Sequence, residues 1–546
     1  MKALGDWAFS AGVNRFVFHR YQHQPWTDIQ PGMTMGPYGV HWERTQTWWG
    51  MVPAYHRYLS RCQFMLRRGL PVADVCYLVE EGSPHVFKPP SSALRGNPPE
   101  RRGYNFDGCA PEVLIAHMSV KDGRLTLPDG MSNRVLVLPE QETMTPALLG
   151  KVSQLVRDGA TVIGPRPLKS PGLSGYPGCD TEVKRIAGET WGECDGTSMT
   201  ERAFGKGRII WHRNSWKETD SLLSGTGAKE PEQYGEFSEV MDVLAKSGEP
   251  QDFESAAPLR YTHRRAARTE IYFVSNPTPE GVNTECTFRI EWKQPELWDP
   301  VEGTIRTLPE LRSADGRTNV RLQFEPYQSY FVVFTGEIDR TGMGTRNFPS
   351  WDTVAIPAGP WRVSFDPRRG GPESAMFDRL EDWTQRPEEG IRYYSGTAVY
   401  KIAFDLPAAV SGGAEKGKGS RGAVRIDLGR VKNIARVTLN GKDAGVVWCS
   451  PWNVDVTGAL KEKGNELEVK IANLWPNRLI GDEKLPPAGE YGKNGNLVRW
   501  PDWILQKNPT LPAGRHTFAT WRHYSKDSPL LPSGLLGPVS LLMERR

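Results

Sequence analysis

The pattern of apolar residues changes near residue 255, and this change limits the folds that the chain can adopt. Before it, nearly continuous apolar stretches such as residues 72–79 alternate with helical patterns, which is typical of a parallel sheet covered on both faces. After it, short apolar stretches lie between turn residues without long helical patterns, which predicts antiparallel sandwiches. Since a domain usually holds about 100–200 residues, the 546 residues predict a multidomain chain, α/β first and all-β afterwards.

Residues 1–70 carry two patterns of a strand or loop followed by a helix. Residues 14–19 predict a strand, and apolar residues at helical spacing predict a helix over 47–68 that ends at Gly69. Two such units are about a quarter of a (β/α)8 barrel of about 250 residues, so they cannot bury a barrel core alone. Because Met1 opens directly onto a helical pattern, we expect the rest of such a barrel in sequence upstream of Met1.

Three further domains are predicted after the first. Residues 71–254 alternate apolar strands at 72–79, 135–138 and 160–164 with a helix at 145–157, which indicates an α/β domain with a mostly parallel sheet. Residues 255–345 and 346–546 each predict a β-sandwich. Within the last, Asn440-Gly441 is a strong signal for a two-residue hairpin, and the low-complexity residues 409–422 predict a surface loop.

Composition narrows the function classes. The 19 Trp, 17 Tyr and 19 Phe residues suit binding to the apolar faces of sugar rings, although large β-rich proteins also place Trp in their cores. The net charge of +4 comes from interspersed charges and gives no reason to expect a nucleic-acid partner. No apolar run of about 18 residues predicts a membrane span, no signal peptide is visible at Met1, and the seven Cys residues include no CxxC pair.

Several motifs together resemble those of the family 106 glycoside hydrolases, which are α-L-rhamnosidases. The resemblance covers essentially the whole chain, and its first block, residues 18–49, is the most specific. The tail motifs are similar to the sugar-binding-like sandwich of family 2 glycosidases. The motifs that carry the resemblance are FHRYQHQPW (18–26), GPYGVHWERTQTWW (36–49), YLSRCQ (58–63), VADV (72–75), SVKDGR (119–124), LPDGM (127–131), LNGK (439–442), WCSPW (448–452), NLWPNR (473–478) and SGLLGP (533–538).

The resemblance implies a domain assignment and an activity. Residues 1–70 would be the last βα units of a catalytic (β/α)8 barrel, 71–254 an α/β amidotransferase-like domain, 255–345 a β-sandwich, and 346–546 a galactose-binding-like jelly-roll sandwich. The activity would be inverting hydrolysis of α-L-rhamnosides in oligosaccharides, polysaccharides or glycosides. The family also implies calcium at the active site, with most of its ligands upstream because acids are scarce here, and a periplasmic or extracellular location.

Inverting glycosidases use an acid and a base about 6.5–9.5 Å apart, and Glu43 is the candidate base. It follows a Gly/Pro-rich loop and precedes Trp48-Trp49, where a barrel loop places active-site residues. Asp6 lies on the opening helix, and Asp28 suits a turn. The alternative for Glu43 is a surface residue that caps the next helix or pairs with Arg44. The partner acid is expected upstream of Met1.

His19, Tyr21 and His23 share one face of an extended segment, because alternate residues of such a segment point the same way. They are candidate sugar-binding residues, together with Trp26, Arg44 and Trp48. Packed polar residues are the alternative for the first three, and core packing for the tryptophans. The HxxxH pair formed by His19 and His23 is a weaker indication of a metal, since neither HExxH nor a helix is present there, and no metal ligand is assigned. Six tryptophans of the tail are further candidates for a sugar-binding face or for core positions: Trp448, Trp452, Trp475, Trp500, Trp503 and Trp521.

Two other functions fit the same sequence. One is a non-catalytic carbohydrate-binding or scaffold protein that remains after loss of the catalytic barrel. The other is a barrel glycosidase of different specificity, such as a β-galactosidase, because the tail domains are shared among these enzymes.

Overall fold

The computed structural model describes residues 1–38, 41–84, 86–96, 103–213, 218–220, 229–338, 346–357, 359–406 and 422–545. The chain forms two compact units, and each unit combines two separate stretches of sequence. Unit 1 comprises Met1–Asn14 and Gln63–Asn347, and unit 2 comprises Arg15–Cys62 and Phe348–Arg546. Apart from Gly422, the predicted surface loop 409–422 lies outside the described residues. The structure is mostly sheet, with few helices.

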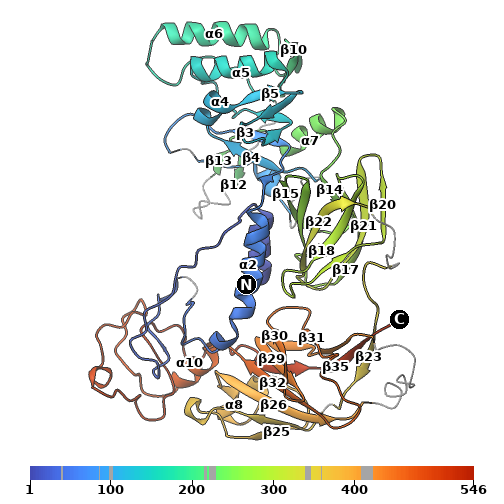
Figure 1. Cartoon of the computed structure of the whole chain (residues 1–546). Helices are drawn as coiled ribbons and strands as arrows, with labels where there is room; N and C mark the ends of the chain where they lie inside the picture. The colour runs from blue at the N-terminus through green and yellow to red at the C-terminus, as the bar shows by residue number, and fades with distance from the viewer. Residues whose placement is uncertain are drawn as a thin grey trace. The chain divides into compact units, whose positions relative to one another are not determined.

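A six-stranded, mostly parallel sheet is the centre of the α/β part of unit 1. Successive residues of β3 (Val75–Leu78) face opposite sides: Val75 and Tyr77 pack with α7 (Phe237–Lys246), whereas Cys76 and Leu78 pack with the helices of the other side. Figure 1 shows two of these helices, α5 and α6, lying side by side. The helices of that side are α4 (Pro111–His117), α5 (Pro146–Asp158) and α6 (Gly178–Trp191), and the strand order is β10 (Glu201–Phe204), β11 (Gly207–Ile210), β9 (Thr161–Ile163), β8 (Val135–Val137), β3 and β4 (Phe106–Cys109), with only β10 antiparallel to its neighbour.

Two antiparallel sheets form a sandwich in the rest of unit 1 (Figure 1). Aromatic rings from the two sheets meet between them, and the Tyr272 and Phe288 rings are 4.9 Å apart. Helix α1 (Lys2–Ser10) packs on the larger sheet, with Phe9 5.8 Å from Phe273. The smaller sheet is β14 (Phe253–Ser255), β17 (Val282–Phe288), β21 (Arg317–Phe324) and β20 (Leu311–Ala314); the larger is β19 (Ile305–Thr307), β18 (Lys293–Trp298), β22 (Ser329–Glu337), β16 (Thr269–Ser275), β15 (Arg260–Ala266) and β2 (Leu70–Pro71).

Unit 2 is built on a second antiparallel sandwich. Its core contains fully buried aromatic side chains, among them Trp361, Trp383 and Tyr400, and the Trp383 indole N–H donates to the Tyr400 hydroxyl at 2.5 Å. The six-stranded sheet is β25 (Ala375–Phe377), β24 (Trp361–Ser364), β26 (Thr397–Phe404), β32 (Asn465–Ala472), β29 (Ile434–Leu439) and β30 (Lys442–Val447); the four-stranded sheet is β23 (Trp351–Ala355), β35 (Ser540–Glu544), β27 (Val424–Asp427) and β31 (Asn453–Asp455).

Smaller elements complete the two units. In unit 1 these are α3 (Ser91–Leu94), the sheet of β5 (Ser119–Lys121), β6 (Arg124–Thr126) and β7 (Ser132–Asn133), and the pair β12 (Glu218–Asp220) and β13 (Lys229–Pro231). In unit 2 they are the pair β28 (Arg430–Lys432) and β34 (Gly534–Gly537), α8 (Glu389–Arg392), α10 (Pro476–Asp482), and the 3-10 turns η1 (Trp49–Met51), η2 (Pro367–Arg369), η3 (Trp383–Gln385) and η4 (Asp502–Leu505). Among the described residues, no helix combines the length and apolar character needed to cross a bilayer.

Most elements that the sequence predicts lie within two or three residues of their predicted places. The helix predicted at 47–68 is η1 followed by α2 (Pro53–Leu66), and Asn440 and Gly441 connect β29 to β30 with φ of 54° and 79°. The strand predicted at 14–19 is wrong: these residues have no regular structure, and the Val17 side chain is 87% exposed. No described strand pairs with the backbone of residues 14–19, so Val17 has no sheet on which its side chain could pack.

Gly534 in β34 meets Trp383 at close range, and replacing it tests how tightly the core of unit 2 is packed. Its φ is +106°, and a Cβ atom there would lie 2.5 Å from the Trp383 Nε1 atom. We expect Gly534→Ala to lower the free energy of unfolding by about 2–4 kcal/mol, through backbone strain and overpacking. Gly458→Ala is the control, because a Cβ atom there would meet nothing within 4 Å. Equal denaturant midpoints for the two variants would contradict the prediction.

Candidate functional site

The segment that carries the predicted site residues is held on unit 2 by hydrogen bonds to distant parts of the chain. The two-residue strand β1 (Pro31–Gly32) pairs in parallel with β33 (Phe518–Ala519). The Trp475 indole N–H donates to the Thr45 carbonyl oxygen at 3.0 Å, and the Thr47 hydroxyl donates to the carbonyl oxygen of Asn473. These bonds fix the backbone on both sides of Glu43, although almost none of it is helix or strand.

Glu43 is a buried carboxyl group, with its residue 1% exposed. Its Oε2 accepts the Thr45 backbone N–H at 2.6 Å, and its Oε1 lies against the Thr45 hydroxyl, which is also 2.7 Å from the Pro31 carbonyl oxygen. A hydroxyl has one proton, so it cannot donate to both oxygens. If Glu43 is protonated, it donates to the Thr45 hydroxyl, which then donates to Pro31, and every acceptor is satisfied.

Burial raises the pKa of the Glu43 carboxyl, because a carboxylate loses its hydration there. The two hydrogen bonds from Thr45 and the charge of Arg44 oppose this rise without cancelling it. The result is a carboxyl group that exchanges its proton closer to neutral pH than an exposed glutamate does. Such a shift suits a group that takes up or releases a proton during a reaction.

Aromatic rings pack around the residues next to Glu43. Trp42 is buried, and its ring lies 4.6 Å from Phe18 in a stacked arrangement and 4.9 Å from Trp48. Its indole N–H donates to His56 Nε2 at 2.8 Å. Trp48 also packs on Met51 and on apolar residues of the sandwich, so its contacts are those of a core residue.

The other predicted sugar-binding residues lie in a different environment from Glu43. His19, Tyr21 and His23 are exposed, as is Arg20 between the first two, whereas Gln22 and Gln24 are buried. Burial therefore does not alternate over the whole segment, and the shared face of the three stays a prediction. Arg44 is exposed, and it donates to the Gln24 carbonyl oxygen at 2.7 Å instead of pairing with Glu43.

The tryptophans of the tail are mostly packing residues. Trp448 lies against Tyr55 and Tyr58, and Trp452 packs on the sandwich core. Of the six tryptophans, Trp500 is the most accessible, at 39% exposure, and its ring lies 5.5 Å from Trp26. The other three are buried or half-buried and pack against neighbouring residues: Trp475, Trp503 and Trp521.

The other two acids considered from sequence are accounted for locally. Asp6 is buried and forms an ion pair with Lys2 at 2.7 Å on α1. Asp28 is exposed in the loop before β1. Neither environment favours a catalytic role for the carboxyl group over a structural one.

Two histidines that the sequence did not single out lie together beside β1. The rings of His41 and His523 are 5.7 Å apart, and His523 Nε2 is 3.3 Å from the Thr34 hydroxyl. Burial lowers the pKa of both, and the neighbouring His41 helps to lower that of His523 to about 4. The two histidines lie far apart in the sequence, so no local motif contains both.

A parallel α/β sheet, antiparallel sandwiches and a tryptophan-rich segment around a buried carboxyl group are typical of multidomain glycoside hydrolases. The sequence profile of the glycoside hydrolase family 106 α-L-rhamnosidases matches residues 1–310. The chain therefore belongs to this family.

Two longer proteins are similar to the chain. A solved rhamnosidase from Novosphingobium sp. PP1Y is 28% identical, with a TM-score of 0.78, over 99% of this chain and 45% of that one. A protein of Formosa agariphila described as a putative β-glucuronidase is 26% identical over 99% of this chain and 61% of its own length. The chain thus spans less than two thirds of the length of either relative.

The histidine pair predicts an acid-sensitive unit 2. The folded His523 has a pKa of about 4, whereas an unfolded one has a pKa near 6.5, so the unfolded chain binds more protons between these values. The stability of unit 2 should fall as the pH drops from about 6.5 to about 4 and then level off. We expect a decrease in Tm of several degrees, since about 1 kcal/mol shifts the Tm of a domain of this size by about 2–4 °C. Calorimetry of the chain and of His523→Gln should show a smaller decrease in the variant, and His23→Gln, at an exposed site, is the control.

Proposed function

We propose that the chain is part of a hydrolase of α-L-rhamnosides that cleaves with inversion, and that Glu43 is its general base. The observation that supports this most is the position of Glu43: a buried carboxyl group of raised pKa, inside the 1–310 segment that matches the family. His19, Tyr21, His23, Trp26, Arg44 and Trp48 are the proposed sugar contacts. No residue of the chain is assigned as the partner acid.

The proposed step needs Glu43 in its ionised form. The carboxylate would take a proton from water as the water oxygen attacks the anomeric carbon and the glycosidic bond breaks on the opposite face of the sugar. The Thr45 backbone N–H, at 2.6 Å, would stabilise the carboxylate and hold its orientation before the step. Because Glu43 is 1% exposed, the proposed step requires that its carboxylate become accessible to water.

Substrate and location are part of the same proposal. A rhamnose-containing saccharide or glycoside is the proposed substrate, and export to the periplasm or cell exterior is proposed from the family alone. The domain assignment stays as the sequence suggests: a barrel portion, an amidotransferase-like domain and two sandwiches, the last of them galactose-binding-like. The two sandwiches and the parallel sheet of the structure are consistent with it.

The described residues of this chain do not supply a calcium site, so calcium at the active site stays a proposal from the family resemblance. Calcium takes six to eight oxygen ligands, and the described residues include no group of three His, Cys, Asp or Glu side chains placed to hold a metal. No step of the proposed mechanism therefore involves the ion.

Two other functions have an observation in their favour. The similarity to the Formosa agariphila protein described as a putative β-glucuronidase favours a β-glucuronide as substrate. The burial of Glu43 favours a carbohydrate-binding protein without catalysis, since a base that is 1% exposed has little access to a water molecule.

Activity measurements on the longer protein of which the chain is proposed to be part, and on its Glu43→Gln variant, test the mechanism. Loss of a general base should lower kcat on an aryl α-L-rhamnoside by about 10²–10⁴-fold. Asp28→Asn makes the same kind of change at an exposed position of the same segment and should leave kcat within about twofold of the parent chain, because an exposed turn residue takes no part in the step. Full activity of Glu43→Gln would remove Glu43 from the mechanism.

A panel of aryl glycosides separates the candidate functions. We expect cleavage of the α-L-rhamnoside and not of the β-D-glucuronide or β-D-galactoside. Cleavage of the glucuronide alone would overturn the specificity. If the longer protein of which the chain is proposed to be part cleaves none of the three glycosides but binds rhamnose by calorimetry, the non-catalytic function is correct.

A further inference from the structure

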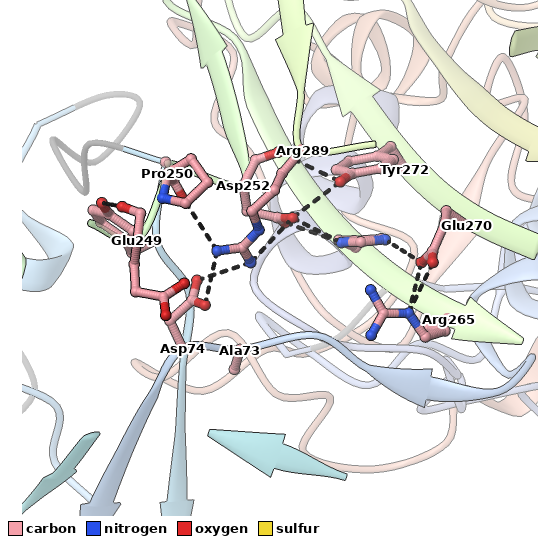
Figure 2. Close-up of polar contacts among 12 residues, drawn as sticks. Ala73, Asp74, Glu249, Pro250, Asp252, Arg265, Glu270, Tyr272 and Arg289 are labelled. Atoms are coloured by element: carbon pink, nitrogen blue, oxygen red, sulfur yellow. Dashed lines mark hydrogen bonds and ion pairs between the residues drawn. The ribbon is translucent and has the colours of Figure 1, made fainter. Parts of the chain in front are cut away.

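A buried group of charged side chains joins the α/β part of unit 1 to its sandwich (Figure 2). We call Asp74, Asp252, His263, Glu270 and Arg289 the junction cluster. Asp74 directly precedes β3 of the parallel sheet, His263 and Glu270 belong to β15 and β16 of the sandwich, and Arg289 follows β17. The four residues other than Arg289 are at most 5% exposed, and the Arg289 side chain is 14% exposed.

The His263 imidazole lies between two carboxyl groups. Its Nδ1 is 3.0 Å from both carboxylate oxygens of Asp252, and its Nε2 is 3.0 Å from Oε2 of Glu270. A neutral imidazole has one N–H and one lone pair, so either tautomer places a lone pair against a carboxylate oxygen. Only the imidazolium ion donates to both neighbours.

Asp252 connects the imidazole to Arg289, and Arg289 contacts the α/β part. Its Oδ1 is 3.3 Å from Arg289 Nη2 and accepts the Tyr272 hydroxyl at 2.9 Å. Arg289 donates from Nη1 and Nη2 to the two carboxylate oxygens of Asp74, at 3.0 and 3.2 Å. Figure 2 shows these contacts as one continuous chain from Asp74 through Arg289 to Asp252.

A proton on the imidazole offsets part of the buried negative charge of the junction. Asp74, Asp252 and Glu270 are three buried carboxylates, and Arg289 supplies one buried positive charge. Arg265 and Lys293 also reach Glu270, at 2.8 and 3.7 Å, but the Arg265 side chain is 54% exposed and its charge is partly screened by water. A buried charge without a partner is strongly destabilising, so an imidazolium beside Asp252 and Glu270 stabilises the junction.

We infer that the junction cluster is a pH-sensitive joint, in which the His263 proton holds the α/β part on the sandwich and its loss at alkaline pH loosens this contact without unfolding unit 1. Proton loss leaves one N–H for two carboxylates, so either Asp252 or Glu270 loses its hydrogen bond to the ring. The sheets have separate apolar cores and remain folded.

The direction of the pH dependence follows from the charges. Burial alone would lower the pKa of His263, but Asp252 and Glu270 outweigh it and the pKa lies above the ordinary 6.5. A raised folded pKa stabilises the fold below about 6.5, and this stabilisation is lost as the pH rises through the folded value. Burial alone would raise the pKa values of Asp252 and Glu270, but their interactions with His263 lower both values. The stabilisation that these two carboxylates contribute is therefore lost only in acid. Burial keeps the pKa of Tyr272 well above 10, so its hydroxyl does not interfere in the alkaline range.

Hydrogen exchange of the unaltered chain measures the joint directly. Peptides that cover residues 70–79, 250–255 and 260–275 should lose protection between pH 7 and pH 10, after correction for the chemical exchange rate, because the stabilisation from the raised pKa of His263 is lost as the pH rises. Peptides from β32 in unit 2 are the internal reference. Protection that stays constant relative to β32 would overturn the inference.

Two variants separate the proton on His263 from other alkaline effects. In Glu270→Gln a neutral His263 can donate to Asp252 and accept an N–H from the amide, so the alkaline loss of protection should disappear while the fold is kept. His117→Gln, at an exposed position at the end of α4, should keep the full alkaline response. An alkaline loss in Glu270→Gln equal to that of the parent chain would also overturn the inference.

Discussion

The hydrogen bonds between residues 30–47 and residues 473–520 are the constraint on which the candidate site depends. The segment has almost no helix or strand of its own before α2, so its shape comes from β33, Asn473 and Trp475 of the sandwich. An isolated peptide of this sequence would not keep Glu43 buried against Thr45. The position of the proposed base is therefore a property of unit 2 as a whole, and the C-terminal sandwich is part of the support of the site.

The sequence predicts elements well where local and long-range forces agree. Residues 75–78 are apolar, bounded by turns and buried on both faces, and α5 begins at a Thr145 cap that accepts the Leu148 N–H. Prediction fails at residues 14–19, because a short apolar run forms a strand only when a neighbouring strand is available. The domain types and the roles of the site residues, Glu43 included, remain predictions, since they concern chemistry that geometry alone does not test.

Contacts between remote residues explain what sequence reasoning missed. His523 meets Thr34 across 489 positions of sequence, so no window of residues contains both partners. The junction cluster is hidden for the same reason, since Asp74 and Arg289 lie 215 positions apart. His263 and Glu270, by contrast, are close in sequence, and they lie on the neighbouring strands β15 and β16. What could not be foreseen is their burial.

The interleaved composition of the units has a consequence for synthesis of the chain on the ribosome. Residues 15–62 emerge early, yet the strand that pairs with β1 is made only when translation reaches residue 518. Domains of a growing chain usually fold in order from the N-terminus, and here that order is reversed for one segment. Unit 1 can close around its core first, while the tryptophan-rich segment stays exposed for several hundred codons. The segment therefore reaches its buried position only after residues 473–520 have been made.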